Sequence, residues 1–395
     1  DALVLSPGVP FTHPEPHVAV KNAQAAGVSV ISDVELFVTS NPVAKVVGIT
    51  GTNGKSTTTA LLGYLLEVAG RPVEVGGNIG RPVLDFMPLP DDGTYVVELS
   101  SYQIDLAPSL VCDVAVLNNI SRDHLDRHGD MAGYVAIKRS IFRGQYGTNA
   151  AVIGVDDDHS RATYEWLREQ GHANLIPIAV GQSLDHGICV IDGVLHDRIS
   201  KTDDTVALHG IATLRGSHNW QNVAATYAAA RCLGLTRDQI AEALPRFPGL
   251  AHRAESIAEI GGVEYVNDSK ATNAEAAARS LATFDDIYWI AGGRAKEGGY
   301  AALAPHLNHI RHAYLIGEAA PDLAATLAGK VETTQSDTMG SAVAAATQAA
   351  QLAGGHSVVL LSPACASFDQ FSDYAARGDA FRTLVAGLAA NGGAA

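Results

Sequence analysis

The sequence predicts an α/β protein with a central domain built on a mostly parallel, P-loop-type sheet and a C-terminal Rossmann-like α/β domain. Three observations predict this class. Short runs rich in β-branched residues alternate with helical runs of about 10 to 15 residues, which is typical of βαβ units. A glycine-rich loop near residue 51 joins an apolar run to a helical one. The chain of 395 residues is long enough for two or three domains.

Residues 1–41 are predicted to be the trailing part of an N-terminal Rossmann-like domain. Residues 2–5 and 28–31 have the composition of strands, and a helical run lies between them at 16–26. The chain begins without Met and enters a strand at once, so we expect that the first part of this domain is missing. The break at Asn41-Pro42 marks the predicted boundary.

Residues 42–249 are predicted to form the central domain, in which strands and helices alternate. The predicted strands are 46–50, 73–75, 95–99, 114–118, 151–155 and 176–180. A turn at Asp192-Gly193 between two apolar runs, 188–190 and 194–195, indicates a hairpin. The predicted helices are 55–69, 219–232 and 237–244. The domain is predicted to end at three residues that interrupt regular structure, Pro245, Pro248 and Gly249.

Residues 250–395 repeat the alternation and are predicted to form the C-terminal domain. The predicted strands are 256–260, 263–266, 287–291, 313–316 and 358–361. The predicted helices are 274–284, 300–310, 322–328, 338–352 and 378–389. This alternation indicates a second, largely parallel sheet.

Composition and charge exclude several classes of protein. The chain carries 27 Lys and Arg against 42 Asp and Glu, a net charge of −15, and such a surface repels nucleic acid and anionic membranes. The four cysteines show no CxxC spacing, which argues against a zinc site or a disulfide framework and favours a reducing, cytoplasmic compartment. No apolar run reaches about 18 residues, so we expect no membrane-spanning helix.

The strongest motif is the glycine-rich segment 48–57, which joins a predicted strand to a predicted helix. Its glycines let main-chain N–H groups turn towards phosphate oxygens, and the helix N-terminus adds its positive dipole. Lys55 would bind the β- and γ-phosphates of a nucleotide, and the hydroxyl of Ser56 or Thr57 would bind Mg²⁺. The strict pattern G-x-x-x-x-G-K-[ST] needs glycine at position 49, where Ile49 stands, so this is a variant phosphate loop.

Three further features point to chemistry, and each also has a plainer interpretation. Glu98 ends a strand near the phosphate loop, where a carboxylate either holds Mg²⁺ or is simply solvated. Segment 118–126 follows another strand and contains His124, which is either functional or structural. Lys138 follows Tyr134 by four residues at the edge of a predicted buried stripe, where a lysine ordinarily extends its amine to solvent.

The variant loop at 51–57 resembles the ATP loop of the Mur ligase and folylpolyglutamate synthase superfamily. Those enzymes couple ATP cleavage to formation of an amide bond between a carboxylate and an amino acid. The resemblance implies that Lys138 is carbamylated and becomes an anionic metal ligand, for which its amine must be neutral. By the same match, Lys138 and His124 would hold a second Mg²⁺ in addition to the ion held by Ser56 and Glu98.

Four further segments resemble the branch of the Mur ligase family that adds D-glutamate to UDP-N-acetylmuramoyl-L-alanine. They are 216–222, 251–253, 267–273 and 362–371. The Asp-Asn-Pro-Arg motif of the relatives that add meso-diaminopimelate is absent from the sequence. The resemblance runs from residue 1 to about residue 390 and implies three domains, of which the first, UDP-binding domain is only partly represented by residues 1–41.

The resemblance carries individual site residues over to this sequence. ATP would be contacted by Gly51, Thr52, Asn53, Gly54, Lys55, Ser56, Thr57, Asn219, Asn222, Arg253 and Asp268. The UDP-substrate would be contacted by Ser6, Pro7, Gly8, Asn78, Ser100, Gln103 and His124. The carboxylates of D-glutamate would be held by Thr272, Lys296, Ser367 and Tyr374. Tyr374 stands where the family commonly has Phe, and the loop at 292–296 departs from the commoner family form.

The implied reaction has two steps. ATP phosphorylates the L-alanyl carboxylate to an acyl phosphate, and the amine of D-glutamate then displaces phosphate to form the amide. Both steps build negative charge, which Lys55, Lys270 and Mg²⁺ would neutralise. Glu98, His124 and Lys138 complete the predicted catalytic set. We expect a monomeric, cytoplasmic enzyme of peptidoglycan precursor synthesis that needs ATP and two Mg²⁺ ions.

Three alternatives stay open from the sequence alone. The chain is another Mur-type or folylpolyglutamate-type ligase, or a silent nucleotide-binding fragment that lacks its uridine pocket, or a phosphate-loop NTPase switch unrelated to ligation. The second α/β domain with segment 267–273 argues against the third alternative. Phosphate release from ATP, measured with the UDP-substrate and D-glutamate, L-glutamate or meso-diaminopimelate, discriminates among them.

Overall fold

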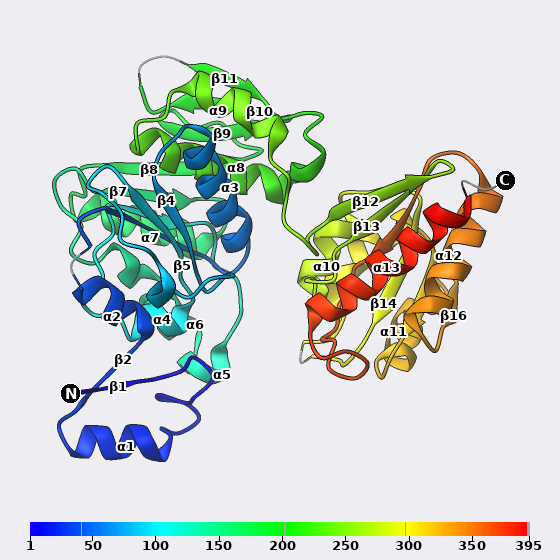
Figure 1. Ribbon diagram of the computed structural model, residues 1–395, viewed down its shortest axis with the longest axis horizontal. Helices are drawn as coiled ribbons and strands as arrows, with labels where there is room; N and C mark the ends of the chain where they lie inside the picture. The colour runs from blue at the N-terminus through cyan, green and yellow to red at the C-terminus, as the bar shows by residue number, and fades with distance from the viewer. Residues whose placement is uncertain (41, 201–202, 297, 393–395) are drawn as a thin grey trace. The chain divides into compact units, whose positions relative to one another are not determined.

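The computed structural model describes residues 1–392 except 41, 201–202 and 297, and the chain forms two compact units, Asp1–Phe247 and Pro248–Ala395. Each unit is built on a main sheet with helices packed on both faces (Figure 1). The predicted α/β class is therefore confirmed. The division into 1–41, 42–249 and 250–395 stays a prediction, and residues 1–40 pack within the first unit.

The first unit contains a nine-stranded sheet. Its strands are β3 (Lys45–Thr50), β4 (Val73–Gly77), β5 (Thr94–Glu98), β6 (Val114–Leu117), β7 (Ala150–Gly154), β8 (Leu175–Val180), β9 (Gly187–Ile191), β10 (Val194–Arg198) and β11 (Asp204–Ala207). They lie in the order β11-β10-β9-β8-β7-β6-β3-β5-β4, parallel from β4 to β9 and antiparallel from β9 to β11. Because β3 lies between β5 and β6, the loops that follow these three strands meet at one edge of the sheet.

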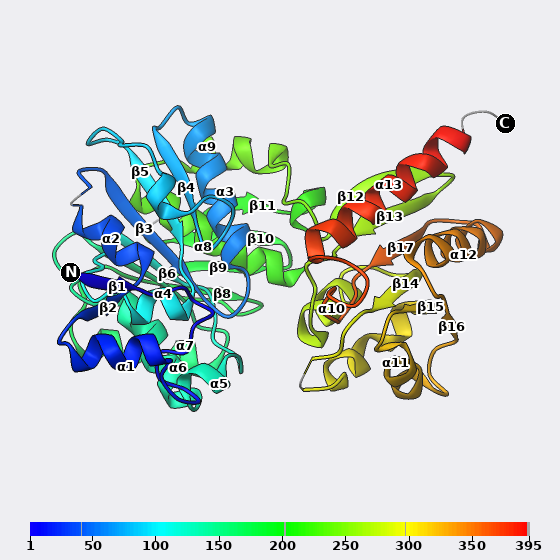
Figure 2. The ribbon, with the colours of Figure 1, turned by 60° about the horizontal axis from the view of Figure 1, so that its bottom comes forward.

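Helices cover both faces of this sheet because alternate residues of its strands point to opposite sides. Val47 and Ile49 of β3 lie in one core, and Val46 lies in the other. The first core is covered by α3 (Lys55–Val68), α8 (Ser217–Cys232) and α9 (Arg237–Ala243). The second is covered by α2 (Asp33–Thr39), α4 (Ser101–Asp105), α5 (Leu125–His128), α6 (Met131–Arg139) and α7 (Asp158–Glu169) (Figure 2).

The N-terminal segment forms a small sheet of its own. Strands β1 (Ala2–Val4) and β2 (Ser29–Ile31) pair in parallel around helix α1 (Val18–Ala25), as the sequence predicts. Leu5 and Val20 pack with Leu106, at the end of α4, in a separate small core. This core fixes the N-terminal segment to the end of α4, the helix that follows β5.

The second unit contains a six-stranded sheet. Its strands are β12 (Glu255–Ile260), β13 (Val263–Asn267), β14 (Ile287–Gly292), β15 (Ile310–Ile316), β16 (Thr333–Gln335) and β17 (Ser357–Leu361). They lie in the order β12-β13-β17-β14-β15-β16, and every pair except β12 and β13 is parallel. One face is covered by α10 (Ala274–Leu281) and α11 (Ala320–Leu327), and the other by α12 (Met339–Ala353) and α13 (Tyr374–Gly392).

Several elements differ from the sequence predictions. The predicted helix at 300–310 is a 3₁₀ helix, Ala301–His309, because Pro305 inside it cannot donate a main-chain hydrogen bond. Residue 310 already belongs to β15, three residues before the predicted strand start. The sequence interpretation also missed helices α2 and α7 and the short strands β11 and β16.

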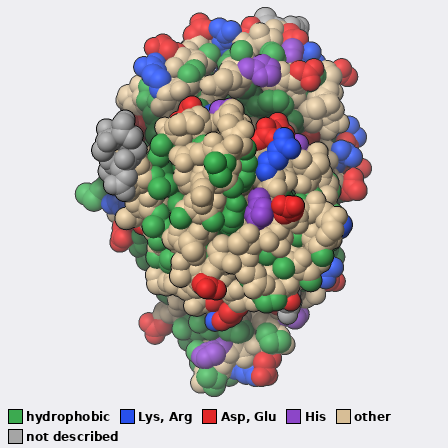
Figure 3. Space-filling view, turned by 90° about the vertical axis from the view of Figure 1, so that its right-hand side faces the viewer, with side chains coloured by type: hydrophobic (Ala, Val, Ile, Leu, Met, Phe, Trp, Pro, Cys, Tyr) green, Lys and Arg blue, Asp and Glu red, His purple; other side chains and the backbone are tan. Residues whose placement is uncertain are grey.

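On the face drawn in Figure 3, acidic and basic side chains are scattered among apolar and uncharged ones. Within the described residues, every helix is too short or too polar to cross a bilayer.

Candidate active site

The phosphate loop joins β3 to α3 and turns on two glycines with positive φ, Gly51 at 152° and Gly54 at 81°. Asn119 braces the loop from the end of β6, because its side-chain oxygen accepts from the main-chain N–H of Asn53 at 2.9 Å. The Lys55 amine donates to the carbonyl oxygen of Gly51 at 2.9 Å. The amine therefore lies over the loop at the N-terminus of α3, where loops of this kind bind phosphate.

Helix α8 meets the phosphate loop at Gly54. A Cβ atom on Gly54 would lie 2.0 Å from the side-chain oxygen of Asn222, and Asn222 donates to the side-chain oxygen of Asn219 at 3.1 Å. The two asparagines predicted to contact ATP thus adjoin each other and the loop. The buried oxygens without a hydrogen-bond partner in the described structure include Asn222 Oδ1 and Asn118 Oδ1, whose side chains both lie against Gly54, and also Glu98 Oε2 at the end of β5.

Replacing Gly54 by alanine is expected to weaken ATP binding by at least about tenfold, or about 1.4 kcal/mol. The methyl group must displace Asn222, and a φ of 81° costs an L-residue about 1–2 kcal/mol. Gly70→Ala is the matched control, because Gly70 has a φ of 71° but a Cβ added there would meet no atom within 4 Å. Calorimetric titration with ATP compares the variants, and equal affinities would contradict the prediction.

Glu98 ends β5 with its side chain 2% exposed, so its interpretation as a solvated carboxylate is wrong. One carboxylate oxygen accepts from the Asn78 amide at 2.8 Å, and the other is the unpartnered Oε2. An anionic oxygen without a donor fits Mg²⁺, which prefers such ligands. Among the described residues no three His, Cys, Asp or Glu side chains gather around one point, so further ligands would come from groups such as the Ser56 hydroxyl.

Lys138 lies on α6 with only 1% of its side chain exposed, so the interpretation of an amine that reaches solvent is wrong. The amine donates to the Gly51 carbonyl oxygen at 2.9 Å and lies 4.9 Å from the centre of the Tyr134 ring. Burial, and then the neighbouring charge of Lys55, hold the pKa of Lys138 well below its usual range. The protein thus favours the neutral amine, which is the form that can be carbamylated.

His124 is the residue immediately before α5, and its backbone is in the left-handed region with a φ of 51°. Its Nδ1 lies 3.2 Å from the Tyr102 hydroxyl, and its Nε2 lies 3.3 Å from the Asp123 carboxylate. Burial lowers the pKa of His124, and although Asp123 opposes this shift, Lys55 and Lys138 lower it further. These causes favour the neutral imidazole, which is the form that can bind a metal ion.

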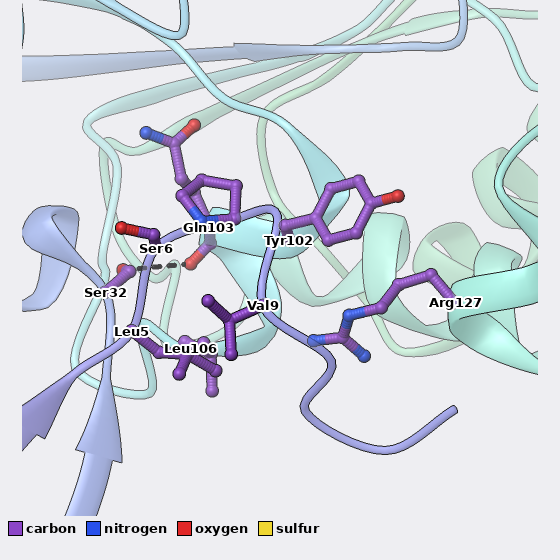
Figure 4. Close-up of a pocket in the computed structure, with 9 residues that line it drawn as sticks. Leu5, Ser6, Val9, Ser32, Tyr102, Gln103, Leu106 and Arg127 are labelled. Atoms are coloured by element: carbon purple, nitrogen blue, oxygen red, sulfur yellow. Dashed lines mark hydrogen bonds between the residues drawn. The ribbon is translucent and has the colours of Figure 1, made fainter. Parts of the chain in front are cut away.

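A pocket beside α4 gathers part of the predicted UDP-substrate site (Figure 4). Ser6, Pro7 and Gln103 line it, while Ser100 lies outside it and caps α4, its hydroxyl accepting from the main-chain N–H of Gln103 at 3.2 Å. The sequence interpretation missed Arg127 in this pocket. Its guanidinium is buried, pairs with Asp105 at 3.2 Å and donates to the Thr12 hydroxyl at 2.9 Å. Arg127 lies three residues after His124, just beyond a segment already singled out.

In the second unit, Asp268 follows β13 and is buried. One carboxylate oxygen accepts from the main-chain N–H of Ala254, and the other accepts from the hydroxyls of Ser280 and Ser362. Asp268 thus connects the loop after β13 to the loop after β17 and to the segment that contains Arg253. Its interpretation as part of a surface turn is therefore wrong.

Asp268→Asn is expected to remove a pH-dependent loss of stability. Burial raises the pKa of Asp268 from 3.8 to about 6. Since folding raises this pKa, Asp268 costs almost nothing well below pH 3.8; its cost grows as the pH rises from 3.8 towards about 6 and levels off at about 3 kcal/mol near pH 7. Urea unfolding at pH 4.5 and pH 7 measures the free energy of unfolding of both proteins. Asp322→Asn, at an exposed position in the same unit, is the control, and parallel pH profiles for wild type and Asp268→Asn would contradict the prediction.

The predicted D-glutamate residues lie on loops at the carboxyl ends of three adjacent strands. Thr272 follows β13, Lys296 follows β14, and Ser367 follows β17. Tyr374 begins α13, and its ring centre lies 3.7 Å from the Lys270 amine. Ser367 is buried, whereas Lys296 is exposed. The topology therefore places these residues at the same edge of the sheet.

Comparison with known proteins decides the family. Two family profiles match the chain, the Mur ligase middle domain over residues 49–230 and the Mur ligase glutamate ligase domain over residues 252–365. The chain is also 51% identical over 389 residues to the UDP-N-acetylmuramoylalanine--D-glutamate ligase of Rhodospirillum rubrum, a match that covers 98% of this chain and 82% of that protein. The chain belongs to the Mur ligase family.

Other relatives agree with this family assignment. This Mur ligase is 50% identical over 401 residues to the protein of the same name from Caulobacter vibrioides, a match that covers 100% of this chain and 85% of that protein. A solved UDP-N-acetylmuramate-alanine ligase from Thermotoga maritima has a TM-score of 0.65 at 14% identity, with coverage of 94% of this chain and 82% of the other. MurF from Acinetobacter baumannii has a TM-score of 0.63 at 21% identity, with coverage of 89% and 78%. At these identities the solved structures show the fold alone.

Proposed function

We propose that this Mur ligase adds D-glutamate to UDP-N-acetylmuramoyl-L-alanine at the expense of ATP, in cytoplasmic synthesis of peptidoglycan precursors. The observation that carries the proposal is the 51% identity, over 98% of the chain, to a relative named for this reaction. The glutamate ligase profile over residues 252–365 supports the same amino-acid class.

The residues of the first unit suit the first step, transfer of phosphate from ATP to the L-alanyl carboxylate. The loop N–H groups and the Lys55 amine would hold the phosphates and neutralise the charge that develops on them. Asn219 and Asn222, which adjoin the loop, would hold the nucleotide on the other side. Mg²⁺, when bound, would neutralise phosphate charge as a Lewis acid.

We further propose two Mg²⁺ ions. Ser56 and Glu98 would hold one ion, which the unpartnered Glu98 Oε2 supports. His124 and carbamylated Lys138 would hold the other, which the neutral forms favoured at both residues support.

The second unit suits the second step, attack of the D-glutamate amine on the acyl phosphate. Thr272, Lys296, Ser367 and the N-terminus of α13 at Tyr374 would hold the two carboxylates. Lys270 would neutralise the tetrahedral intermediate before phosphate departs. The chain supplies all these groups itself, so we propose that it acts as a monomer.

Phosphate release from ATP tests the function. The assay contains UDP-N-acetylmuramoyl-L-alanine and, in separate reactions, D-glutamate, L-glutamate or meso-diaminopimelate. Release that requires D-glutamate and yields a product heavier by one glutamyl residue supports the proposal. Release that requires another amino acid, or that needs neither substrate, would overturn it.

A further inference from the structure

Arg377 is a buried cation of the second unit that the two reaction steps do not use. It lies in the first turn of α13, three residues after Tyr374, and its side chain is 1% exposed. Burial lowers the pKa of Arg377 to about 10, so the guanidinium still carries its charge at pH 7. A buried charge is costly to keep, and a protein retains one only where its contacts offset that cost.

The Arg377 guanidinium connects the loops that follow three strands. Its Nη2 donates to the Ser269 carbonyl oxygen at 2.8 Å, and its Nε donates to the Ser269 hydroxyl at 3.0 Å, after β13. Its Nη1 donates to the Cys365 carbonyl oxygen at 3.1 Å, after β17, and more weakly to the Gly292 carbonyl oxygen at 3.5 Å, at the end of β14. One planar side chain thus holds three adjacent sheet loops.

The connected positions adjoin the predicted substrate ligands in the chain. Ser269 immediately precedes Lys270, and Cys365 lies two residues before Ser367. The Ser269 hydroxyl also donates to the Tyr374 carbonyl oxygen at 2.8 Å, which fixes the start of α13. Each residue predicted to bind a carboxylate of D-glutamate therefore lies within a few residues of a group that is hydrogen-bonded to Arg377 or Ser269, or is itself such a residue.

The hydrogen-bond partners of Arg377 are uncharged groups rather than a carboxylate. Within the described residues its hydrogen-bond acceptors are three main-chain carbonyls and one hydroxyl, and no carboxylate forms a salt bridge with it. Two glycines make room for this arrangement. A Cβ on Gly293 would lie 3.1 Å from Arg377 Nη1, and one on Gly378 would lie 2.2 Å from the ring of His252, against which α13 packs. The backbone is thus shaped to bring under the loops a positive charge that has no hydrogen bond to a carboxylate among the described residues, although the negative charges of Asp369 and Asp268 lie near enough to favour it.

We propose that Arg377 is a positioning residue of the amino-acid site, which sets the spacing of the three ligand-bearing loops and adds positive charge beneath a dicarboxylate substrate. This inference rests on the proposed function. Arg377 acts through the loops rather than by touching the amino acid. Lysine cannot replace it, because an ammonium is a point charge that cannot reach three separate acceptors with a planar fork.

Kinetics of Arg377→Lys test the proposal. We expect the KM for D-glutamate to rise at least about tenfold, since a loop shift of about 1 Å can cost about a hundredfold. The KM for UDP-N-acetylmuramoyl-L-alanine, assigned to the first unit, should change less than about twofold. In Arg377→Ala, guanidinium ion at about 10 mM should lower the raised KM for D-glutamate part of the way to the wild-type value, and methylammonium should not lower it.

Arg382→Gln is the matched control, because Arg382 lies on the same helix but pairs with Glu255 and Asp379 at the surface, at 2.8 and 2.7 Å. Its D-glutamate KM should equal that of the wild type. A wild-type D-glutamate KM in Arg377→Lys would overturn the proposal. Equal rises in the KM of both substrates, together with a lowered Tm, would also overturn it, because they would show a role in stability alone.

Amide hydrogen exchange without substrate separates this inference from the proposed function. Arg377→Lys should exchange faster than wild type at residues 269–272 and 364–367, whereas Arg382→Gln should not. Wild-type protein that shows no D-glutamate-dependent phosphate release would refute the function, and the exchange result would still decide the loop connection. Unchanged exchange in both loops would overturn the connection.

Discussion

Replacing Lys138 by methionine is expected to lower ligase turnover by a factor of about 100 to 1,000 while the protein stays folded. Methionine retains an unbranched apolar stem that fills most of the buried space on α6, but it has no amine. Removal of one preorganised group that stabilises charge in a transition state costs about this much. The free energy of unfolding should be unchanged or higher, because a desolvated amine disappears from the interior.

The reason for this large effect is the carbamate that the site is suited to form. A neutral lysine amine attacks CO₂, an N–C bond forms, a proton is released, and the side chain then ends in a carboxylate. Burial and the charge of Lys55 favour the neutral amine that this reaction needs. The product is anionic and lies beside the phosphate loop, since the amine contacts the Gly51 carbonyl oxygen.

Two measurements check the role of Lys138. Turnover of wild type should fall in CO₂-depleted buffer and recover when bicarbonate is added, and ¹³C-bicarbonate should give a carbamate resonance that Lys138→Met lacks. Arg139→Ala is the control, because Arg139 is the next residue of α6 but lies over the Trp166 ring. Wild-type turnover that is insensitive to CO₂, with no carbamate resonance, would contradict the prediction.

The phosphate loop was predictable from sequence because strand, glycines and helix are contiguous there. The loop lies between β3 and α3, as expected. Lys138 was only partly predictable. The sequence placed it at the edge of a buried stripe that included Ile137, whereas in the structure Lys138 is buried and Ile137 is only partly so. Tyr134 and Lys138 lie one turn apart on α6 and are both buried, which a spacing of four residues allows but which the sequence interpretation did not assign to Lys138.

Contacts between distant segments were not predictable in the same way. Arg377 holds Ser269, which is 108 residues earlier in the sequence, and no local pattern records this pairing. The sequence analysis predicted this helix only from residue 378, whereas α13 begins at Tyr374 and includes Arg377. Phe381 and Val385 follow Arg377 at helical spacing and are buried, as it is. Helix α7 was missed because its apolar stripe is narrow, with only Leu167 among its large apolar residues fully buried. Such elements are held mainly by tertiary packing.

Glu98→Gln is expected to lower turnover by about 100-fold and to raise the Mg²⁺ concentration needed for half-maximal activity at least about tenfold. The change retains the shape of the side chain and the acceptor for the Asn78 amide. It replaces the unpartnered, anionic Oε2 with an uncharged amide nitrogen. Since Mg²⁺ binds anionic oxygen and amide nitrogen is no ligand for it, the loss falls on metal binding.

Stability should change in the opposite direction to activity. A buried carboxylate oxygen without a donor costs free energy, and an uncharged amide costs less to bury. Glu98→Gln should therefore be as stable as wild type or more stable, by up to about 1–2 kcal/mol in urea unfolding without Mg²⁺. A gain of stability with a loss of activity is expected where a polar group is kept for a ligand rather than for the fold.

Glu35→Gln separates this effect from the removal of any buried carboxylate. Glu35 is 6% exposed, lies in the same unit and accepts from the main-chain N–H of Ser109 at 3.0 Å, so it already has a donor. Its glutamine variant should lose stability, because a charge-assisted hydrogen bond is weakened, while its Mg²⁺ dependence should stay that of wild type. If both variants instead shifted the Mg²⁺ dependence equally, Glu98 would have no special role as a metal ligand. If Glu98→Gln lost as much stability as Glu35→Gln, the Oε2 oxygen of Glu98 would contribute to the stability of the fold, and the prediction of a gain in stability would be wrong.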